Sequence, residues 1–244
     1  MTLPAAIAST AEDPTVRRST ALRWAGWSGL AMLVVIVLNG PLGAIRGLPD
    51  IWGQDAVTAV GSYLTNAGSL RLAVIFFFLS TLIFVFGIPF FAGLRELTKV
   101  TGAPNLASGA VTIGAALFLG GGLLSEVMST GMATVVQAAP SYTLDANAAL
   151  ATQSLQFAAL IQGQVGLGVV MIAVSLAARS QGFGVPGLVT LGLIAGVIDL
   201  LRPLAVTVPP LAIALFLPTF VWMALASATL MRSPRSIAEV AASA

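Results

Sequence analysis

The sequence GGGLLSEVMST, residues 120–130, places one carboxylate, that of Glu126, inside an apolar segment that is long enough to cross a bilayer. A charged side chain within a membrane-spanning helix costs about 2.5–3.5 kcal/mol on insertion scales, so such a group is normally paired, protonated or turned toward a polar cavity. We therefore expect Glu126 to have a polar partner on another helix.

The composition defines the class of protein. Hydrophobic residues make up 57% of the chain and charged residues 8%, whereas a soluble protein carries about 25% charged residues. A soluble protein with this composition would have too few polar residues to cover its surface. We predict an all-α fold, a polytopic transmembrane helical bundle in contact with the lipid bilayer.

Six segments are apolar enough and long enough to be spans, because a membrane helix needs about 20 mostly apolar residues. They cover residues 21–45, 70–94, 105–137, 146–178, 185–206 and 211–231. The prediction is a six-helix transmembrane domain over residues 21–231. It is preceded by a disordered cytoplasmic tail, residues 1–20, and followed by a cytoplasmic C-terminal tail, residues 232–244.

The third and fourth segments are longer than a bilayer requires. Residues 105–137 would form about 50 Å of helix, against a hydrocarbon core of about 30 Å. We expect these two helices to project outward as a hairpin, in which Pro140 ends one helix and Thr143 or Asp145 begins the next. On the same side, Asp55 is expected to cap a short surface helix.

Basic residues predict the orientation. With the N-terminus inside, eight of the eleven basic residues face the cytoplasm: Arg17, Arg18, Arg23, Arg95, Lys99, Arg179, Arg232 and Arg235. Because cytoplasmic loops are enriched in Lys and Arg, we expect both termini in the cytoplasm. The expected location is the plasma membrane, as a multi-pass protein of a bacterial inner membrane.

The polar residues inside the predicted spans are the candidate site. Six of them lie about 21–27 Å from the cytoplasmic ends at a rise of about 1.5 Å per residue: Asn39, Glu126, Gln162, Gln164, Asp199 and Arg202. The simplest pairing joins Glu126 to Arg202 across two helices. Asp199 competes, because it stands three residues before Arg202 on the same helix face.

Two interpretations of this polar layer remain open. Two acids and one base leave a spare carboxyl group, as a ligand site or a proton-coupled site would require. Alternatively, the polar residues are interhelical glue, where each contact contributes about 0.6 kcal/mol on average.

Small residues predict close packing of the third, fourth and fifth helices. They are Ala110, Gly114, Gly163, Gly166, Gly168, Gly192 and Gly196. The run 120–122 has two interpretations, either more of this packing or a flexible break of the kind that lines transporter sites.

Missing residue types exclude several membrane enzymes. The chain has no histidine and no cysteine, so Ser-His catalysis and His-based zinc sites are excluded. Aspartyl intramembrane proteolysis needs two intramembrane aspartates, and the spans contain only Asp199. We therefore expect no enzymatic activity, no cofactor and no metal. Because the positive charge lies at the span ends, we also expect no nucleic-acid partner.

Short motifs resemble a family of bacterial six-span integral membrane proteins that is known only as a domain of unknown function. The motifs are DAVTA (55–59) leading into SLRL (69–72), VPGLVTLGLIAG (185–196) and Trp222 near the end of the last span. The chain departs from that pattern before the tryptophan, where it has TFV (219–221) instead of a sequence with Glu. The resemblance implies a multi-pass plasma-membrane protein and transfers no activity.

Two functional hypotheses follow. In the first, a non-enzymatic membrane protein binds or moves a small or lipid-like molecule at the polar layer. In the second, an accessory membrane subunit contacts another membrane protein through its outer hairpin, Thr130 to Gln156, and its charges are only structural.

Overall fold

The computed structural model describes residues 14–46, 55, 57–58, 67–138, 145–205 and 216–232. Helices make up nearly all of these residues, and no strand occurs among them. The elements are α1 (Pro14–Arg46), α3 (Ala67–Val100), α4 (Asn105–Ala138), α5 (Ala146–Gln181), α6 (Leu188–Leu201), the 3-10 helix η1 (Arg202–Ala205) and α8 (Phe216–Arg232). The predicted all-α class is confirmed for this part of the chain.

Helix length separates the elements into two groups. The helices α1, α3, α4 and α5 have 33, 34, 34 and 36 residues, and each is long and apolar enough to cross a membrane. In contrast, α6 has 14 residues and α8 has 17. These two helices are about 21 and 26 Å long, which is less than a hydrocarbon core of about 30 Å. Within the described residues, the last two predicted spans are apolar helices shorter than the other four, and residues 211–215 of the sixth predicted span lie outside the described ranges.

Two helix starts show how local sequence sets the boundaries. The first helix begins at Pro14, so residues 14–20 of the predicted tail are helical. Proline suits a first helical turn because its missing N–H would have no partner there. Of the two predicted starts of the fourth helix, Thr143 and Asp145, the structure has Asp145 as the N-cap, and its side chain accepts a hydrogen bond of 3.2 Å from the backbone N–H of Asn147.

Other predictions fall on residues outside the described ranges. These are the tails before Pro14 and after Arg232, the predicted helix end at Pro140 and helix start at Thr143, and most of the surface segment that follows Asp55.

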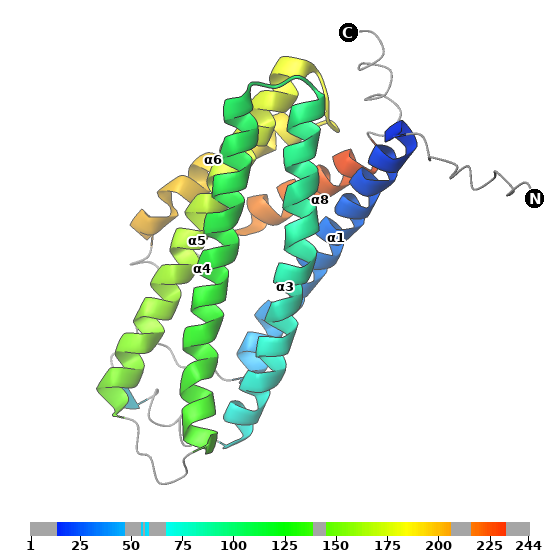
Figure 1. Ribbon diagram of the computed structural model, residues 1–244. Helices are drawn as coiled ribbons and strands as arrows, with labels where there is room; N and C mark the ends of the chain where they lie inside the picture. The colour runs from blue at the N-terminus through cyan, green and yellow to red at the C-terminus, as the bar shows by residue number, and fades with distance from the viewer. Residues whose placement is uncertain are drawn as a thin grey trace, which may run out of the picture.

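The six helices form a closed ring in which each helix packs on the next. The order is α1, α3, α4, α5, α6, α8 and back to α1. The four long helices run side by side, while α6 and α8 cover only about half of their length (Figure 1). The core inside this ring includes Met32, Phe90, Phe91, Val111, Met171 and Trp222, all buried.

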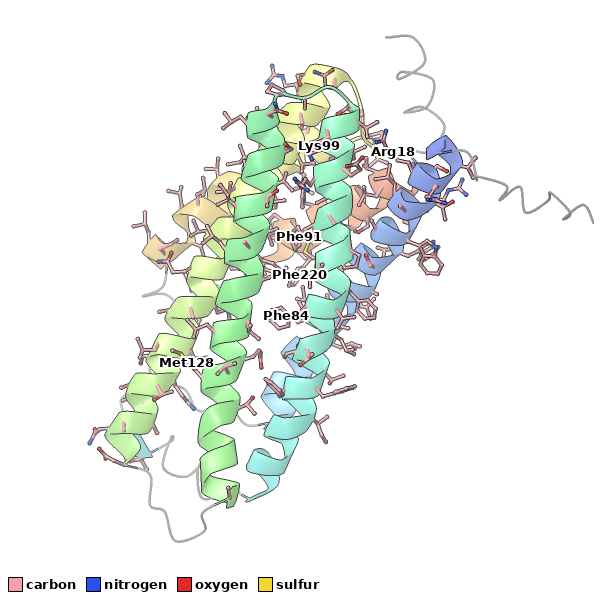
Figure 2. All side chains as sticks on the ribbon, viewed as in Figure 1. Arg18, Phe84, Phe91, Lys99, Met128 and Phe220 are labelled. Atoms are coloured by element: carbon pink, nitrogen blue, oxygen red, sulfur yellow. The ribbon has the colours of Figure 1, made fainter. Side chains whose placement is uncertain are left out.

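Exposed positive charge gathers where α1 begins, α3 meets α4 and α8 ends, and we call this the basic end. The exposed basic residues there are Arg17, Arg18, Arg23, Arg95, Lys99, Arg179 and Arg232. Arg18 and Lys99 lie at this end of the bundle, whereas Met128 lies toward the other end (Figure 2). One ion pair joins α1 to α3 here, with Arg18 Nε 3.2 Å from Glu96 Oε1.

Close packing of α4 on α5 depends on glycines, as predicted. A Cβ atom added at Gly121 would lie 2.7 Å from the carbonyl oxygen of Ala159 and 2.8 Å from the Cα of Gly163. At Gly120, by contrast, an added Cβ meets nothing within 4 Å. Since α4 is continuous from Asn105 to Ala138, the glycine run does not break the helix, and Gly121 is the member of the run that serves packing.

The substitution Gly121→Ala is expected to destabilise the protein, because it forces the backbones of α4 and α5 apart. Overpacking of this kind typically costs about 1–3 kcal/mol. Thermal unfolding in detergent micelles measures the effect. Gly120→Ala is the matched control, and it should be neutral or slightly stabilising because alanine has the higher helix propensity. Equal effects at the two positions would contradict the packing.

Candidate functional site: a buried ion pair where α6 meets α8

The strongest polar feature of the bundle is an ion pair at the end of α6. The Oδ1 atom of Asp199 contacts the Nη2 atom of Arg202, which begins η1. Both side chains have an exposed fraction of 0%. Arg202 therefore pairs with the acid three residues earlier in the chain, which is the alternative to Glu126 that the sequence offers.

The helix α8 closes this ion pair from the other side. Thr219 donates a hydrogen bond of 3.1 Å from its hydroxyl group to Oδ2 of Asp199. The guanidinium carbon of Arg202 lies 3.9 Å from the centre of the Phe216 ring, which is a cation–π contact. Asp199 thus contacts Arg202 of η1 and Thr219 of α8, and Arg202 contacts Asp199 of α6 and Phe216 of α8. This network connects the two short helices.

The helix α5 forms the third wall of the site, and glycine makes the close approach possible. A Cβ atom added at Gly168 would lie 3.1 Å from the Cβ of Asp199 and 2.8 Å from the carbonyl oxygen of Gly196. Gln164, one turn away on α5, is also buried. The predicted glycine packing of α5 on α6 is therefore confirmed at Gly168 and Gly196, beside the ion pair.

A second contact between α6 and α8 surrounds Gly192. Trp222 has an exposed fraction of 0%, and its indole ring lies against this glycine together with the hydroxyl group of Ser175. The indole Nε1 is buried and has no hydrogen-bond partner among the described residues. Any side chain larger than hydrogen at Gly192 would push Trp222 away, so this position sets the distance between α8 and α6.

The other predicted site residues lie elsewhere. Asn39 donates a hydrogen bond of 3.3 Å from Nδ2 to the hydroxyl group of Ser80, which joins α1 to α3. Glu126 is half-buried on α4, and Gln162 is exposed on α5.

Glu126 and Asn39 share a level of the bundle. An added Cβ at Gly122 would lie 3.6 Å from the Phe84 ring. Because α3 and α4 are antiparallel, Ser80, one turn before Phe84, lies near the level of Glu126, one turn after Gly122. This second polar level therefore contains Asn39, Ser80 and Glu126.

The two polar levels are separate, so the single predicted layer is corrected. Gly121 faces Gly163, which puts Glu126 near the level of residue 158 on α5, whereas Asp199 lies beside Gly168. The difference is about 15 Å at about 1.5 Å per residue.

The physical reason for the difference is the oblique course of α6. Ser175 on α5 donates its hydroxyl to the carbonyl oxygen of Leu188, at 3.4 Å. Asp199 lies beside Gly168. The segment of α6 from Leu188 to Asp199 therefore covers the same depth of the bundle as the shorter segment of α5 from Ser175 to Gly168. Counting residues from the end of α6 overestimates the depth of Asp199, because a count assumes parallel helices.

Sequence reasoning missed Thr219 and Phe216 as members of the site. The available signal was the position of Thr219, a polar residue in an apolar helix and three residues before Trp222. Within the described ranges, no group of three or more His, Cys, Asp or Glu side chains comes together in a way that could hold a metal ion.

Comparison with known proteins gives a plain result. The chain matches no protein-family model, no curated protein and no solved structure. The resemblance to a six-span family of unknown function therefore stays a prediction, and the chemistry of the site is the basis for a functional proposal.

Removing one charge of the ion pair is expected to lower the free energy of unfolding more than removing both charges. Asp199→Asn or Arg202→Gln leaves one charge buried without its counter-charge, which typically costs about 3–5 kcal/mol. The double variant removes both charges and should lose much less stability than the sum of the two single variants. Unfolding by sodium dodecyl sulfate measures the four free energies of the cycle.

Gln162→Ala serves as the control for this cycle, since Gln162 is exposed on α5 and should have little effect. Strictly additive single effects would show that Asp199 and Arg202 do not interact.

Proposed function

We propose that the chain is a six-span, non-enzymatic plasma-membrane protein, with both termini in the cytoplasm, that binds or moves a small or lipid-like molecule at the Asp199–Arg202 site. The observation that carries the proposal is the complete burial of an ion pair in the apolar interior of a membrane bundle. Ionisable residues within membrane spans are costly, and they commonly mark ligand or ion pathways.

Stability alone is a poor explanation for this ion pair. Replacing a buried pair by apolar residues of similar volume is often neutral or stabilising, because the free-energy cost of removing two charges from water can exceed the energy of their attraction. An ion pair within a single helix turn also does little by itself to join helices. The interhelical contacts come from Thr219 and Phe216 of α8, and the hydrogen bond from Thr219 would also form to a neutral acceptor at position 199.

The form of the two C-terminal helices supports the same proposal. The helices α6 and α8 are shorter than the other four, and α6 ends in a 3-10 turn at Arg202. Discontinuous helices that end at a polar site within the membrane are a recurring feature of transporters, where the helix ends meet the substrate or the coupling ion. The six-span topology is part of the proposal, with α6 and α8 as the last two spans.

The chemistry of the pair favours a molecule with an acidic group. Arg202 presents a guanidinium fork that suits carboxylate and phosphate groups. An incoming acid would give its proton to Asp199 and take its place as the partner of Arg202, so the net charge of the site would not change, and the neutral carboxyl group of Asp199 would keep its contact with the Thr219 hydroxyl. The Phe216 ring would keep the guanidinium in place throughout the exchange.

The test compares what the purified protein retains. Wild-type protein and the double variant Asp199→Asn/Arg202→Gln are purified in lipid nanodiscs, and their bound small molecules and lipids are identified by mass spectrometry. The wild type should retain a species that the double variant lacks, and adding that species back should raise the melting temperature of the wild type alone. Glu126→Gln, at the other polar level, is the control and should retain the species.

Thr219→Val, which keeps the volume of the side chain, provides a second variant in case the double variant folds poorly. It removes one hydrogen bond from Asp199 and should weaken retention without removing either charge. Identical bound species in the wild type and in both site variants would contradict the proposal.

A second candidate function is that of an accessory membrane subunit. It is favoured by the closed state of the site, in which Asp199 and Arg202 already have partners on α6, η1 and α8. In that case the network only braces the bundle. The same experiment separates the two functions, because an accessory subunit would show lower stability in the site variants with no change in bound species.

A further inference from the structure

The outer face of α1 at the basic end combines exposed tryptophans with exposed arginines. Trp24 and Trp27 have exposed fractions of 71% and 60%, the same face continues through exposed Val34 and Leu38, and Arg23 stands beside the tryptophans. The opposite face carries Leu22 and other buried residues that pack into the core. Tryptophan is enriched at the headgroup level of membranes, where its ring is half in the apolar region.

Arg23 needs an anion that the described part of the protein does not supply. It lies inside the apolar segment Val16–Asn39 and is exposed. The nearest acidic residue on the adjoining helix, Glu96, is already paired with Arg18. An arginine in such a place extends its side chain toward the headgroups, where the guanidinium meets phosphate.

We infer that Arg23, Trp24 and Trp27 form a binding site for the headgroup of an anionic phospholipid. The guanidinium donates to the lipid phosphate, and the two indole rings cover the glycerol region and the upper part of the acyl chains. An anionic headgroup fits better than a zwitterionic one, because the ammonium of a zwitterionic headgroup would be repelled by the guanidinium of Arg23. This site is independent of the Asp199–Arg202 site.

The occupant is a lipid and not a protein because of the gradient of polarity along the face. From Arg17 through the tryptophans to Val34 and Leu38, the exposed residues change from charged to aromatic to aliphatic. A phospholipid has the same sequence of phosphate, glycerol and acyl chain. The face is thus complementary to one lipid in one orientation.

The experiment measures fluorescence quenching of tryptophan by brominated lipids in nanodiscs. The background variant Trp52→Phe leaves Trp24, Trp27 and the buried Trp222 as emitters. Brominated phosphatidylglycerol, mixed into phosphatidylcholine, is compared with brominated phosphatidylcholine at the same mole fraction. Stronger quenching by phosphatidylglycerol reports its enrichment beside α1.

Arg23→Gln should reduce this enrichment about fivefold, which corresponds to the loss of one basic residue near the membrane surface. Arg179→Gln is the matched control, since it removes the same charge from an exposed position at the same end but on α5. The control should keep the enrichment. Equal losses in the two variants, or no enrichment in the parent protein, would overturn the inference in favour of a general surface potential.

Discussion

The carboxylate of Asp199 is completely buried in the protein, so it requires a counter-charge and a hydrogen-bond donor from the neighbouring C-terminal elements. A buried charge without partners is very unfavourable in an apolar interior. Arg202 supplies the counter-charge, and Thr219 supplies a hydroxyl donor from α8. Gly168 lets α5 approach closely enough to exclude lipid from the pair. The position of α8 beside α6 is therefore coupled to the chemistry of a single side chain.

Much of the fold could be predicted from hydropathy and helix signals, and the limits have physical causes. Asp145 begins α5 and the glycines pack α4 on α5, because both effects depend on local sequence and simple geometry. The sequence leaves the partner of Arg202 open between Asp199 and Glu126, since neither the spacing of residues 199 and 202 nor a depth estimate shows which acid lies closer in space. Thr219 was missed because the crossing of α8 over α6 is a tertiary property that no periodicity reveals.

Two polar levels replace the one that residue counting predicted. The level of Asp199 lies where six helices pack together, and the level of Asn39 and Ser80 lies farther from the basic end, where the four long helices continue (Figure 1). Among the described residues, this asymmetry gives the bundle one half in which six helices pack together and one half formed by the four long helices.

Solid-state NMR of the protein in bilayers tests the central claim most directly. Dipolar dephasing between ¹³C-labelled aspartate carboxyl groups and ¹⁵N-labelled arginine side chains reports direct contact, and the variant Asp199→Asn assigns the signal to this residue. We predict strong dephasing that disappears in the variant, because Asp199 and Arg202 form the buried pair. Dephasing that persists in the variant, or a contact of Arg202 with labelled Glu126 instead, would contradict the account.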